Sequence, residues 1–479
     1  MDTAGSPKQT AVSFEMNPEE MQNLVKVYAA NPVFRSAEAT ELVVTDNPYR
    51  RPVRPGDLEF LDYRVPLTAK QVLNLRALIA HRMLRNIYEA ELLLLPKGDD
   101  PAIWQDFELF YSEKNRMQGE RVRSFLEDHV FTFLRENSTA PVHTSAQALK
   151  EEIIATQQGA EAALNQRVDT ILAAYNRQRV AITYLIQLLS AYRAEGAALA
   201  RGLAGDYDGN VSGSLGFLFE PSGTHGTPAA MRSGLLKQLV RSCGLHDEPH
   251  AYWQFYLTSS LALANYAYHL TRDLGKFFQA VGARVYREVH FACSRERQAE
   301  MLRTIFGSTV DTRYFDLPVT KPQEVIDALV TPLVEQYGER ALNDIARGFQ
   351  EYRRLHEIAD NDFITQVTWA DQPDLYRERA QIIYNAIRER NLQVPLDTFV
   401  ELSSETSTTH THDLHRLLVI ESGEMHFWSL SGSPTLFRPG DITLIPRQRL
   451  HGSTVTSGEC TYHQPVISSD LMHELEPLF

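Results

Sequence analysis

The sequence is poor in cysteine, in clustered positive charge and in long apolar runs. Its three cysteines, Cys243, Cys293 and Cys460, are too few and too far apart for a disulfide framework, which fits a reducing compartment. The formal net charge of −14 argues against binding to nucleic acid or to anionic membranes, since phosphate affinity requires clustered Lys and Arg. No apolar run is long enough to span a bilayer, and residues 1–20 lack the pattern of a signal peptide. We therefore expect a cytoplasmic protein with no membrane partner.

The rest of the composition is that of an ordinary globular protein, with 43% hydrophobic and 23% charged residues. A chain of 479 residues is too long for one hydrophobic core, so we expect two or three domains. Residues 146–203 are rich in Ala, Leu, Gln and Glu without Pro, which favours helix at nearly every position. Glycine-rich residues 202–226 predict a long loop. Apolar spacing and composition predict further helices at residues 69–95, 101–136, 231–243, 252–281, 298–306, 322–337, 339–359 and 372–390.

After Asn391 the apolar residues alternate with other residues, as side chains do on a strand. Gly423, Gly432 and Gly440 punctuate this stretch. The pattern predicts a small antiparallel β-domain of the barrel or jelly-roll kind.

Three histidines in the β-domain form the strongest candidate site. His410 and His412 are separated by one residue and point the same way on a strand, so they can hold one ion between them. His451 follows a Gly–Pro turn on a later strand and could close a face of three nitrogens. Such a face leaves coordination positions open, which a catalytic metal requires and a structural metal does not.

The stretch from Gly440 through Pro446 to His451 resembles the second motif of the cupin superfamily, and the His410/His412 pair resembles its first motif. That superfamily usually has a Glu four residues after the second His. Arg416 stands there instead, which leaves a site of three histidines. The alternative is a metal-free barrel whose histidines face a pocket. Three histidines at matching motif positions favour the metal.

Several other residues are weaker candidates. Arg416, Arg447 and Arg449 could pair with a substrate carboxylate, or be solvated surface charges. His356 and Asp360 lie four apart on a helix, where surface pairs are far more common than metal sites, and His246 and His250 flank a turn that we expect to be exposed. The remaining β-domain candidates are expected to be surface residues or supports of the site, and for the cysteine a strand residue before a ligand: His415, His426, His463 and Cys460.

Six short stretches along the chain are specific when taken together, although each alone would be weak. They are residues 28–32 (YAANP), 46–51 (DNPYRR), 88–92 (YEAEL), 252–257 (YWQFYL), 309–312 (TVDT) and 449–452 (RLHG). Through them nearly the whole chain, from about residue 25 to 469, resembles the family of N-nitrosourea-forming metalloenzymes of streptozotocin biosynthesis.

The resemblance implies a multidomain α + β protein. Residues 1–140 would form an N-terminal helical dimerisation domain, residues 141–390 a haem-oxygenase-like helical bundle, and residues 391–479 a cupin β-barrel. It also implies a homodimer and one Fe(II) held in the barrel by His410, His412 and His451, with dioxygen as co-substrate.

The diiron ligands of the family's helical domain mostly do not carry over. Ala191 replaces one glutamate, and Glu195 lies one turn away from that position. Pro318, Pro322 and Val325 stand where the family has His, Asp and His. Glu288 matches one family carboxylate, while Glu220 and His225 align only loosely. Two irons need about six protein donors, so we expect this domain to lack a working diiron site.

The expected function is therefore formation of an N–N bond by a mononuclear Fe(II) oxygenase. Its substrate would be an N-hydroxylated arginine derivative made by a separate N-hydroxylase, and its product a nitrosamine, N-nitrosourea or diazeniumdiolate. Two alternatives stay open. One is a three-histidine cupin dioxygenase acting on an unrelated small molecule. The other is a non-catalytic cupin that serves as a scaffold or sensor.

Overall fold

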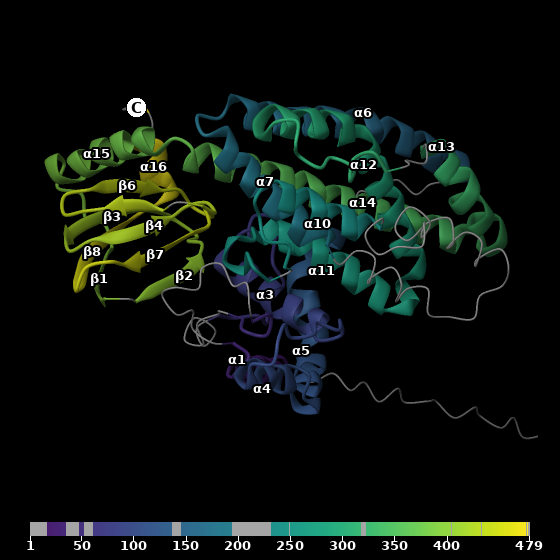
Figure 1. Cartoon of the computed structure of the whole chain (residues 1–479), viewed down its shortest axis with the longest axis horizontal. Helices are drawn as coiled ribbons and strands as arrows, with labels where there is room; N and C mark the ends of the chain where they lie inside the picture. Colours follow the sequence, from purple (N-terminus) through teal and green to yellow (C-terminus); the bar gives the residue numbers. More distant parts are fainter. Residues whose placement is uncertain are drawn as a thin grey trace, which may run out of the picture.

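The computed structural model describes residues 17–34, 47–51, 61–136, 145–193, 231–317 and 322–477, apart from single positions 249, 404, 433 and 476. A long helical body occupies most of the molecule, and a β-domain lies at one end of it (Figure 1). This order of a helical body followed by a cupin-like β-domain confirms the predicted fold class. Glu195, Glu220, His225, Pro318 and the expected loop at residues 202–226 lie outside the described residues.

The N-terminal helices pack on the same core as the central bundle. Val25, Met83 and Leu126 share one buried cluster with Tyr266 and Val281 of the bundle. The predicted helix at residues 69–95 is shorter in the structure, because Asn74 caps its start by accepting a hydrogen bond from the Ala77 N–H at 2.9 Å. These helices are α1 (Pro18–Ala29), α3 (Leu75–Glu89), α4 (Pro101–Phe110) and α5 (Glu113–Glu136).

The central bundle differs from the sequence prediction in where its helices break. The helical stretch expected over residues 146–203 breaks after Ala173 and restarts at Arg177. Asp371 accepts backbone hydrogen bonds from Tyr175 (2.6 Å) and Asn176 (3.0 Å), and so stabilises the break. The bundle helices are α6 (Ala146–Ala173), α7 (Arg177–Tyr192), α10 (Arg232–Ser242), η2 (Trp253–Phe255), α11 (Thr258–Arg272), η3 (Leu274–Lys276), α12 (Phe277–Phe306), α13 (Pro322–Val325), η4 (Ile326–Val330), α14 (Thr331–Ala370) and α15 (Pro373–Glu389).

Helices α12 and α14 cross at two glycines. A Cβ on Gly282 would lie 1.9 Å from the Ile345 carbonyl oxygen, and one on Gly348 would lie 1.9 Å from that of Gln279. The backbones therefore approach more closely than any side chain permits. Helix α14 also bends at Gly338, whose φ of 68° is a left-handed conformation that favours glycine.

The β-domain consists of two four-stranded antiparallel sheets, with strand orders β1-β8-β3-β6 and β2-β7-β4-β5. The tight β3–β4 turn requires Gly423, because a Cβ there would lie 2.0 Å from the Glu459 carbonyl oxygen. The elements are β1 (Leu396–Leu402), β2 (Thr406–His410), β3 (His415–Ser422), β4 (Met425–Trp428), β5 (Thr435–Phe437), β6 (Ile442–Ile445), β7 (His451–Val455), β8 (Glu459–Ile467) and α16 (Ser469–Leu475).

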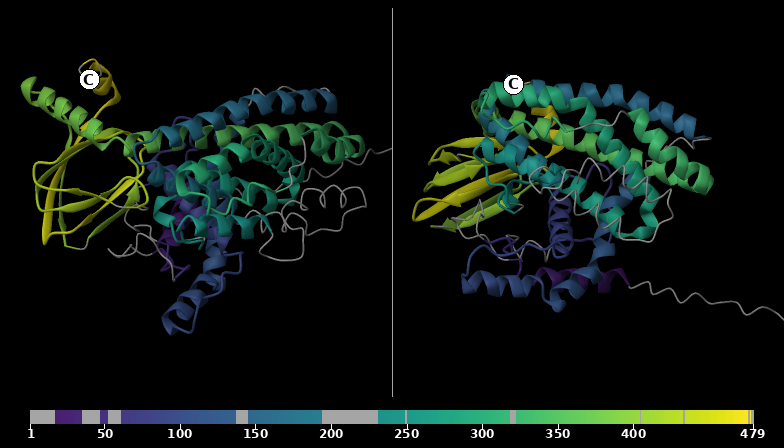
Figure 2. Two further views of the ribbon diagram at one scale, coloured as in Figure 1. Left: turned by 45° about the horizontal axis from the view of Figure 1, so that its top comes forward. Right: turned by 45° about the vertical axis from the view of Figure 1, so that its right-hand side comes forward.

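Two helices connect the barrel to the body. Ala380 and Ile383 of α15 pack on the outer face of the first sheet, against Leu417 and Leu444. At the end of α14, Trp369 joins the buried cluster that fills the barrel. Helix α15, which precedes residue 391, thus packs against the barrel. Figure 2 shows the barrel at one end of the long helices from two further directions. None of the helices described is long and apolar enough to cross a membrane.

Candidate metal centre

The structure brings the three predicted histidines together inside the barrel. His410, the last residue of β2, pairs across the sheet with His451, the first residue of β7. His412 lies two residues beyond His410 and faces the same way. The imidazole centroids are 4.5 Å to 4.9 Å apart, and one nitrogen from each ring lies within 4.8 Å of the others.

Backbone hydrogen bonds fix the tautomer of two of these rings. The Nδ1 of His410 lies 2.8 Å from the Thr408 carbonyl oxygen, and that of His451 lies 2.9 Å from the Arg449 carbonyl oxygen. A carbonyl only accepts, so each Nδ1 carries the proton and each Nε2 keeps its lone pair. The Nε2 atoms of His412 and His451 are buried without a hydrogen-bond partner among the described residues. A metal ion would satisfy both, so the residues present fit one.

The surroundings keep the His412 and His451 imidazoles neutral. Burial is the largest cause that lowers the pKa of His412 and of His451 far below the ordinary value, and the neighbouring His410 lowers both further. Only neutral imidazole binds a metal ion, so the site needs no deprotonation step at neutral pH.

Aromatic side chains form the wall behind His451. The Phe427 ring stacks on His451 at 5.7 Å, and Trp369 lies edge-on to both rings, at 6.3 Å from Phe427 and 6.5 Å from His451. The Trp369 Nε1–H donates to the Leu444 carbonyl oxygen at 3.1 Å, which fixes the indole. This wall excludes water from one side of the histidine group.

The helical body holds Thr409, the residue that directly precedes His410. Thr409 faces away from the barrel interior. Arg82 of α3 donates to its carbonyl oxygen and to its hydroxyl, each at 2.8 Å. The side-chain oxygen of Gln254 accepts a hydrogen bond from the Thr409 N–H at 3.1 Å. Sequence reasoning missed Arg82 and Gln254, because no local pattern connects them to the β-domain.

A second set of contacts holds the segment before His451. Arg449 donates to the Asp362 side chain at 3.1 Å in a buried ion pair. Gln366, one turn further along α14, donates to the Leu450 carbonyl oxygen at 2.9 Å and accepts from the Leu450 N–H at 2.9 Å. Arg449, one of the three arginines considered for a substrate carboxylate, thus has a protein carboxylate as its partner.

The remaining polar residues of the β-domain lie outside the histidine group. Arg447 is exposed. His463 is a surface residue that contacts Glu421 at 3.1 Å. His426 is half-buried on the opposite face from Met425 and Phe427, and His415 lies 3.4 Å from the Arg447 N–H. Cys460 is a buried strand residue of β8, as expected.

Two predictions about histidines of the helical body are wrong. His250 is 3% exposed although its turn was expected at the surface, while His246 is exposed as predicted. His356 and Asp360 are 1% and 5% exposed, and His356 packs on His290 with centroids 4.1 Å apart. Tertiary packing buries these residues, although their local sequence is typical of an exposed segment.

Arginine side chains surround Glu288, the one residue that matches a diiron-binding carboxylate of the family well. Glu288 on α12 accepts two hydrogen bonds from Arg232, at 3.0 Å and 3.2 Å, and forms an ion pair with Arg284 at 2.7 Å. All three side chains are at most 4% exposed. Burial alone would raise the pKa of Glu288, but the guanidinium groups of Arg232 and Arg284 lower it to about 2. Its charge is thus already compensated without a metal.

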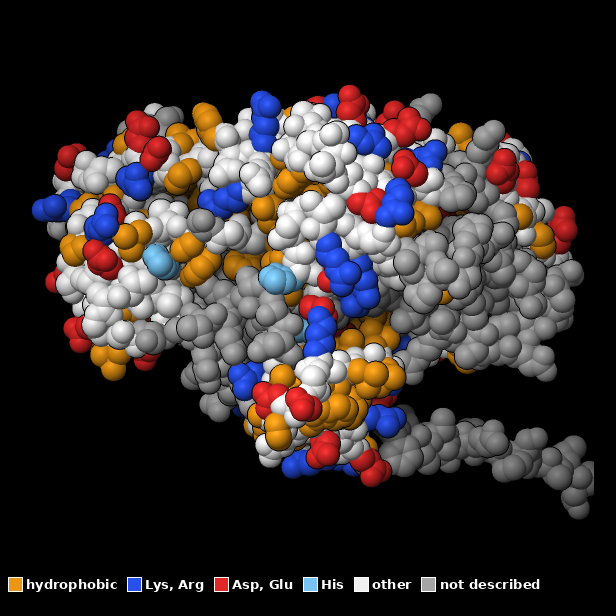
Figure 3. All heavy atoms as spheres, viewed as in Figure 1, with side chains coloured by type: hydrophobic (Ala, Val, Ile, Leu, Met, Phe, Trp, Pro, Cys, Tyr) orange, Lys and Arg blue, Asp and Glu red, His pale blue; other side chains and the backbone are white. Residues whose placement is uncertain are grey.

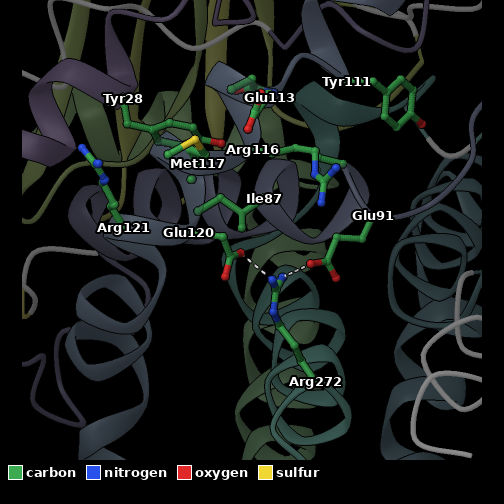
Figure 4. A pocket seen from close by; sticks show the side chains of 13 residues that line it. Tyr28, Ile87, Glu91, Tyr111, Glu113, Arg116, Met117, Glu120, Arg121 and Arg272 are labelled. Atoms are coloured by element: carbon green, nitrogen blue, oxygen red, sulfur yellow. Dashed lines mark hydrogen bonds and ion pairs between the residues drawn. The ribbon is translucent and has the colours of Figure 1, made fainter. Parts of the chain in front are cut away.

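A cleft of about 640 Å³ lies elsewhere, among the N-terminal helices. Figure 4 shows Arg272 of α11 at its floor, reaching between Glu91 and Glu120, with which it forms ion pairs. None of the three clustered histidines lines this cleft.

Fold and site together define a cupin-type protein with a three-histidine centre, fused to a helical body. No known family model matches the sequence. The chain is 34% identical over 458 residues to nitrosourea synthase of Streptomyces achromogenes subsp. streptozoticus, and the match covers 94% of this chain and 96% of that enzyme. The chain therefore belongs to the nitrosourea synthase family, which confirms the resemblance seen in the sequence.

Proposed function

We propose that this protein is a mononuclear Fe(II) oxygenase that forms an N–N bond by oxidative rearrangement of an N-hydroxylated arginine derivative. The observation that carries the proposal is the convergence of His410, His412 and His451, two of which present buried Nε2 atoms that have no hydrogen-bond partner in the described part of the chain. Similarity along almost the whole chain to a protein named nitrosourea synthase supports the reaction class.

His410, His412 and His451 would hold the iron. Bound Fe(II) would supply one-electron chemistry toward dioxygen, and three neutral protein ligands leave positions open for small molecules. The chain's own contribution is to fix the imidazoles. The Thr408 and Arg449 carbonyl groups orient two rings, and Phe427 and Trp369 keep water from the site.

We also propose that the helical domain has no diiron site. The arginines around Glu288 place positive charge where the family has metal ions, and cations there oppose the binding of further cations. Ala191 and Val325 at other ligand positions offer no donor atom. The substrate would then reach this enzyme already hydroxylated by a separate N-hydroxylase.

We propose a homodimer because of the resemblance to the family, and the surface of the N-terminal helices supports this proposal. Apolar side chains gather over the N-terminal helices on the face shown in Figure 3. Among the residues of the N-terminal helices and the segments that join them, Leu93 is 74% exposed, Leu95 63% and Trp104 40%. Exposed apolar groups of this size are typical of interfaces. Sedimentation of the wild type and of L93D/W104D would show a dimer that the double variant converts to monomer; a monomeric wild type contradicts this part.

The experiment for the reaction is aerobic incubation of Fe(II)-loaded protein with L-arginine or with Nω-hydroxy-L-arginine, followed by oxygen uptake and mass spectrometry. We expect an N–N-bonded product from the hydroxylated compound only. Turnover of L-arginine itself would contradict the proposed loss of the diiron site. Iron binding without consumption of either compound would favour the three-histidine dioxygenase with an unrelated substrate. Absence of iron binding would favour the scaffold or sensor.

A further inference from the structure

Arg416 faces the interior of the barrel. On β3, Leu418 and Ile420 belong to the cluster that fills the barrel, whereas Leu417 packs outward against α15. Side chains alternate along a strand, so Arg416 lies on the inner face with Leu418. Its partner across the ladder to β6 is Ile445, which belongs to the same inner cluster.

The strand ends place Arg416 beside the histidine group. Strand β2 ends at His410, β3 begins at His415 and β7 begins at His451, so Arg416 and the three histidines lie at the same end of the barrel. Only residues 411–414 separate β2 from β3, so Arg416 follows the His410/His412 pair closely along the chain. His451 pairs with His410 across β2 and β7 at this same end.

One edge of the Arg416 guanidinium group is hydrogen-bonded to protein side chains, and a second edge is available to a ligand. Its Nη1 donates to the Asp397 carboxylate and to the Gln464 side-chain oxygen, the latter at 3.3 Å. Asp397 and Gln464 are directly paired between β1 and β8, so they form one support. The Nε–H is buried and has no hydrogen-bond partner among the described residues. The Nε–Nη2 edge, a fork that matches a carboxylate, is left for a ligand.

Arg416 differs in this respect from the other two arginines near the site. Arg449 is committed to Asp362, and Arg447 is exposed. Only 19% of the Arg416 side chain is exposed, so it is largely shielded from water and a ligand can still reach it. Asp397 is 46% exposed, so its own charge is partly screened by solvent.

We propose that Arg416 binds the α-carboxylate of an amino-acid substrate through its Nε–Nη2 edge, while Asp397 and Gln464 hold Nη1. This assignment rests on the proposed function, because it takes the substrate to be arginine-derived. The extended side chain of such a substrate separates its carboxylate from its guanidine by several bonds. One end can therefore meet Arg416 while the other reaches the histidine group.

The test compares two probes, Nω-hydroxy-L-arginine and its decarboxylated counterpart Nω-hydroxyagmatine, on Fe(II)-loaded wild type, R416Q and R447Q. A hydrogen-bonded contact to a charged group contributes about 1.5–3 kcal/mol, or roughly 10- to 150-fold. We expect the wild type and R447Q to prefer the carboxylate-bearing probe by this factor in kcat/KM, and R416Q to lose the preference. R416K should restore part of it, because Lys keeps the charge but not the fork.

The outcomes are separable. If R416Q keeps the preference for the carboxylate-bearing probe, the assignment of Arg416 is wrong. The assignment is also wrong if the wild type consumes both probes equally well. Both results leave the proposed function intact. A wild type that consumes neither probe contradicts the proposed function and with it the substrate assigned to Arg416. The iron content of R416Q should equal that of the wild type, since Arg416 is not a ligand. If R416Q does not fold, the comparison of the two probes on the wild type still tests whether the substrate carboxylate contributes to recognition.

Discussion

Arg82 on helix α3 and Thr409 on strand β2 lie 327 positions apart and share two hydrogen bonds of 2.8 Å. Arg82 is 1% exposed and Thr409 is also 1% exposed, so both bonds are shielded from water. Thr409 directly precedes His410, and Thr411, which separates His410 from His412, lies 3.4 Å from the Leu73 carbonyl oxygen on the same side. The helical body thus forms the back of the histidine group, and would support that group even without a metal of its own.

The Arg82 contact should determine how well the site binds iron. Replacing Arg82 with Met removes both bonds to Thr409, and loss of an outer-shell support typically weakens metal affinity by about 10- to 100-fold. Anaerobic Fe(II) titration measures this change, and R82K, which can keep one bond, should give an intermediate value. The control is R438M, because Arg438 pairs with Glu424 on the exposed barrel surface. Equal iron affinity in R82M and the wild type would show that the helical body does not position the ligands.

Glu288 predicts a pH dependence of stability. Its pKa in the folded protein is about 2, below the ordinary 4.5, so the carboxylate contributes stability above pH 4.5. That contribution decreases as the pH falls from 4.5 toward 2. At pH 7, E288Q should lower the free energy of unfolding by an amount on the order of 3 kcal/mol, and the difference from wild type should shrink at acid pH.

Urea denaturation at several pH values measures this difference. The matched control is E296Q on the same helix, whose side chain is 90% exposed and should have no comparable effect. A difference between E288Q and wild type that stays constant with pH would argue against a charged Glu288 in the arginine cluster.

Two glycine substitutions should change stability in opposite directions. Gly348→Ala places a Cβ 1.9 Å from the Gln279 carbonyl oxygen, so α12 and α14 must separate, at a cost of about 1–3 kcal/mol or more. Gly159→Ala on α6 meets no atom within 4 Å and should stabilise the protein by about 0.5–1 kcal/mol through helix propensity. Thermal unfolding of the pair tests the close crossing. Equal shifts in Tm would contradict it.

The histidine group was predictable because its geometry is local. The spacing of one residue keeps His410 and His412 together although β2 already ends at His410, and a turn of defined spacing brings back His451. The long-range supports were not predictable, since Arg82, Gln254 and Asp362 become neighbours of the site only through tertiary packing. For the same reason sequence could not separate Arg416, which faces the barrel interior, from Arg449, which is bound to Asp362.

Helix boundaries and burial were the weaker part of the sequence prediction. The break between α6 and α7 depends on Asp371, nearly two hundred positions later in the chain. Helix α12 continues through residues 281–298, which the sequence left between two separate helices. His356 is buried because α12 packs over it, which no pattern within α14 reveals.

The most direct test of the whole account is the iron content of protein reconstituted anaerobically with Fe(II) and freed of excess metal. The account predicts a single iron per chain in the wild type, in E288Q and in H426A. It predicts none in H410A, H412A or H451A, because two imidazoles alone do not retain the ion. Two or more irons per chain, or an iron that remains after the three histidines are removed, would contradict it.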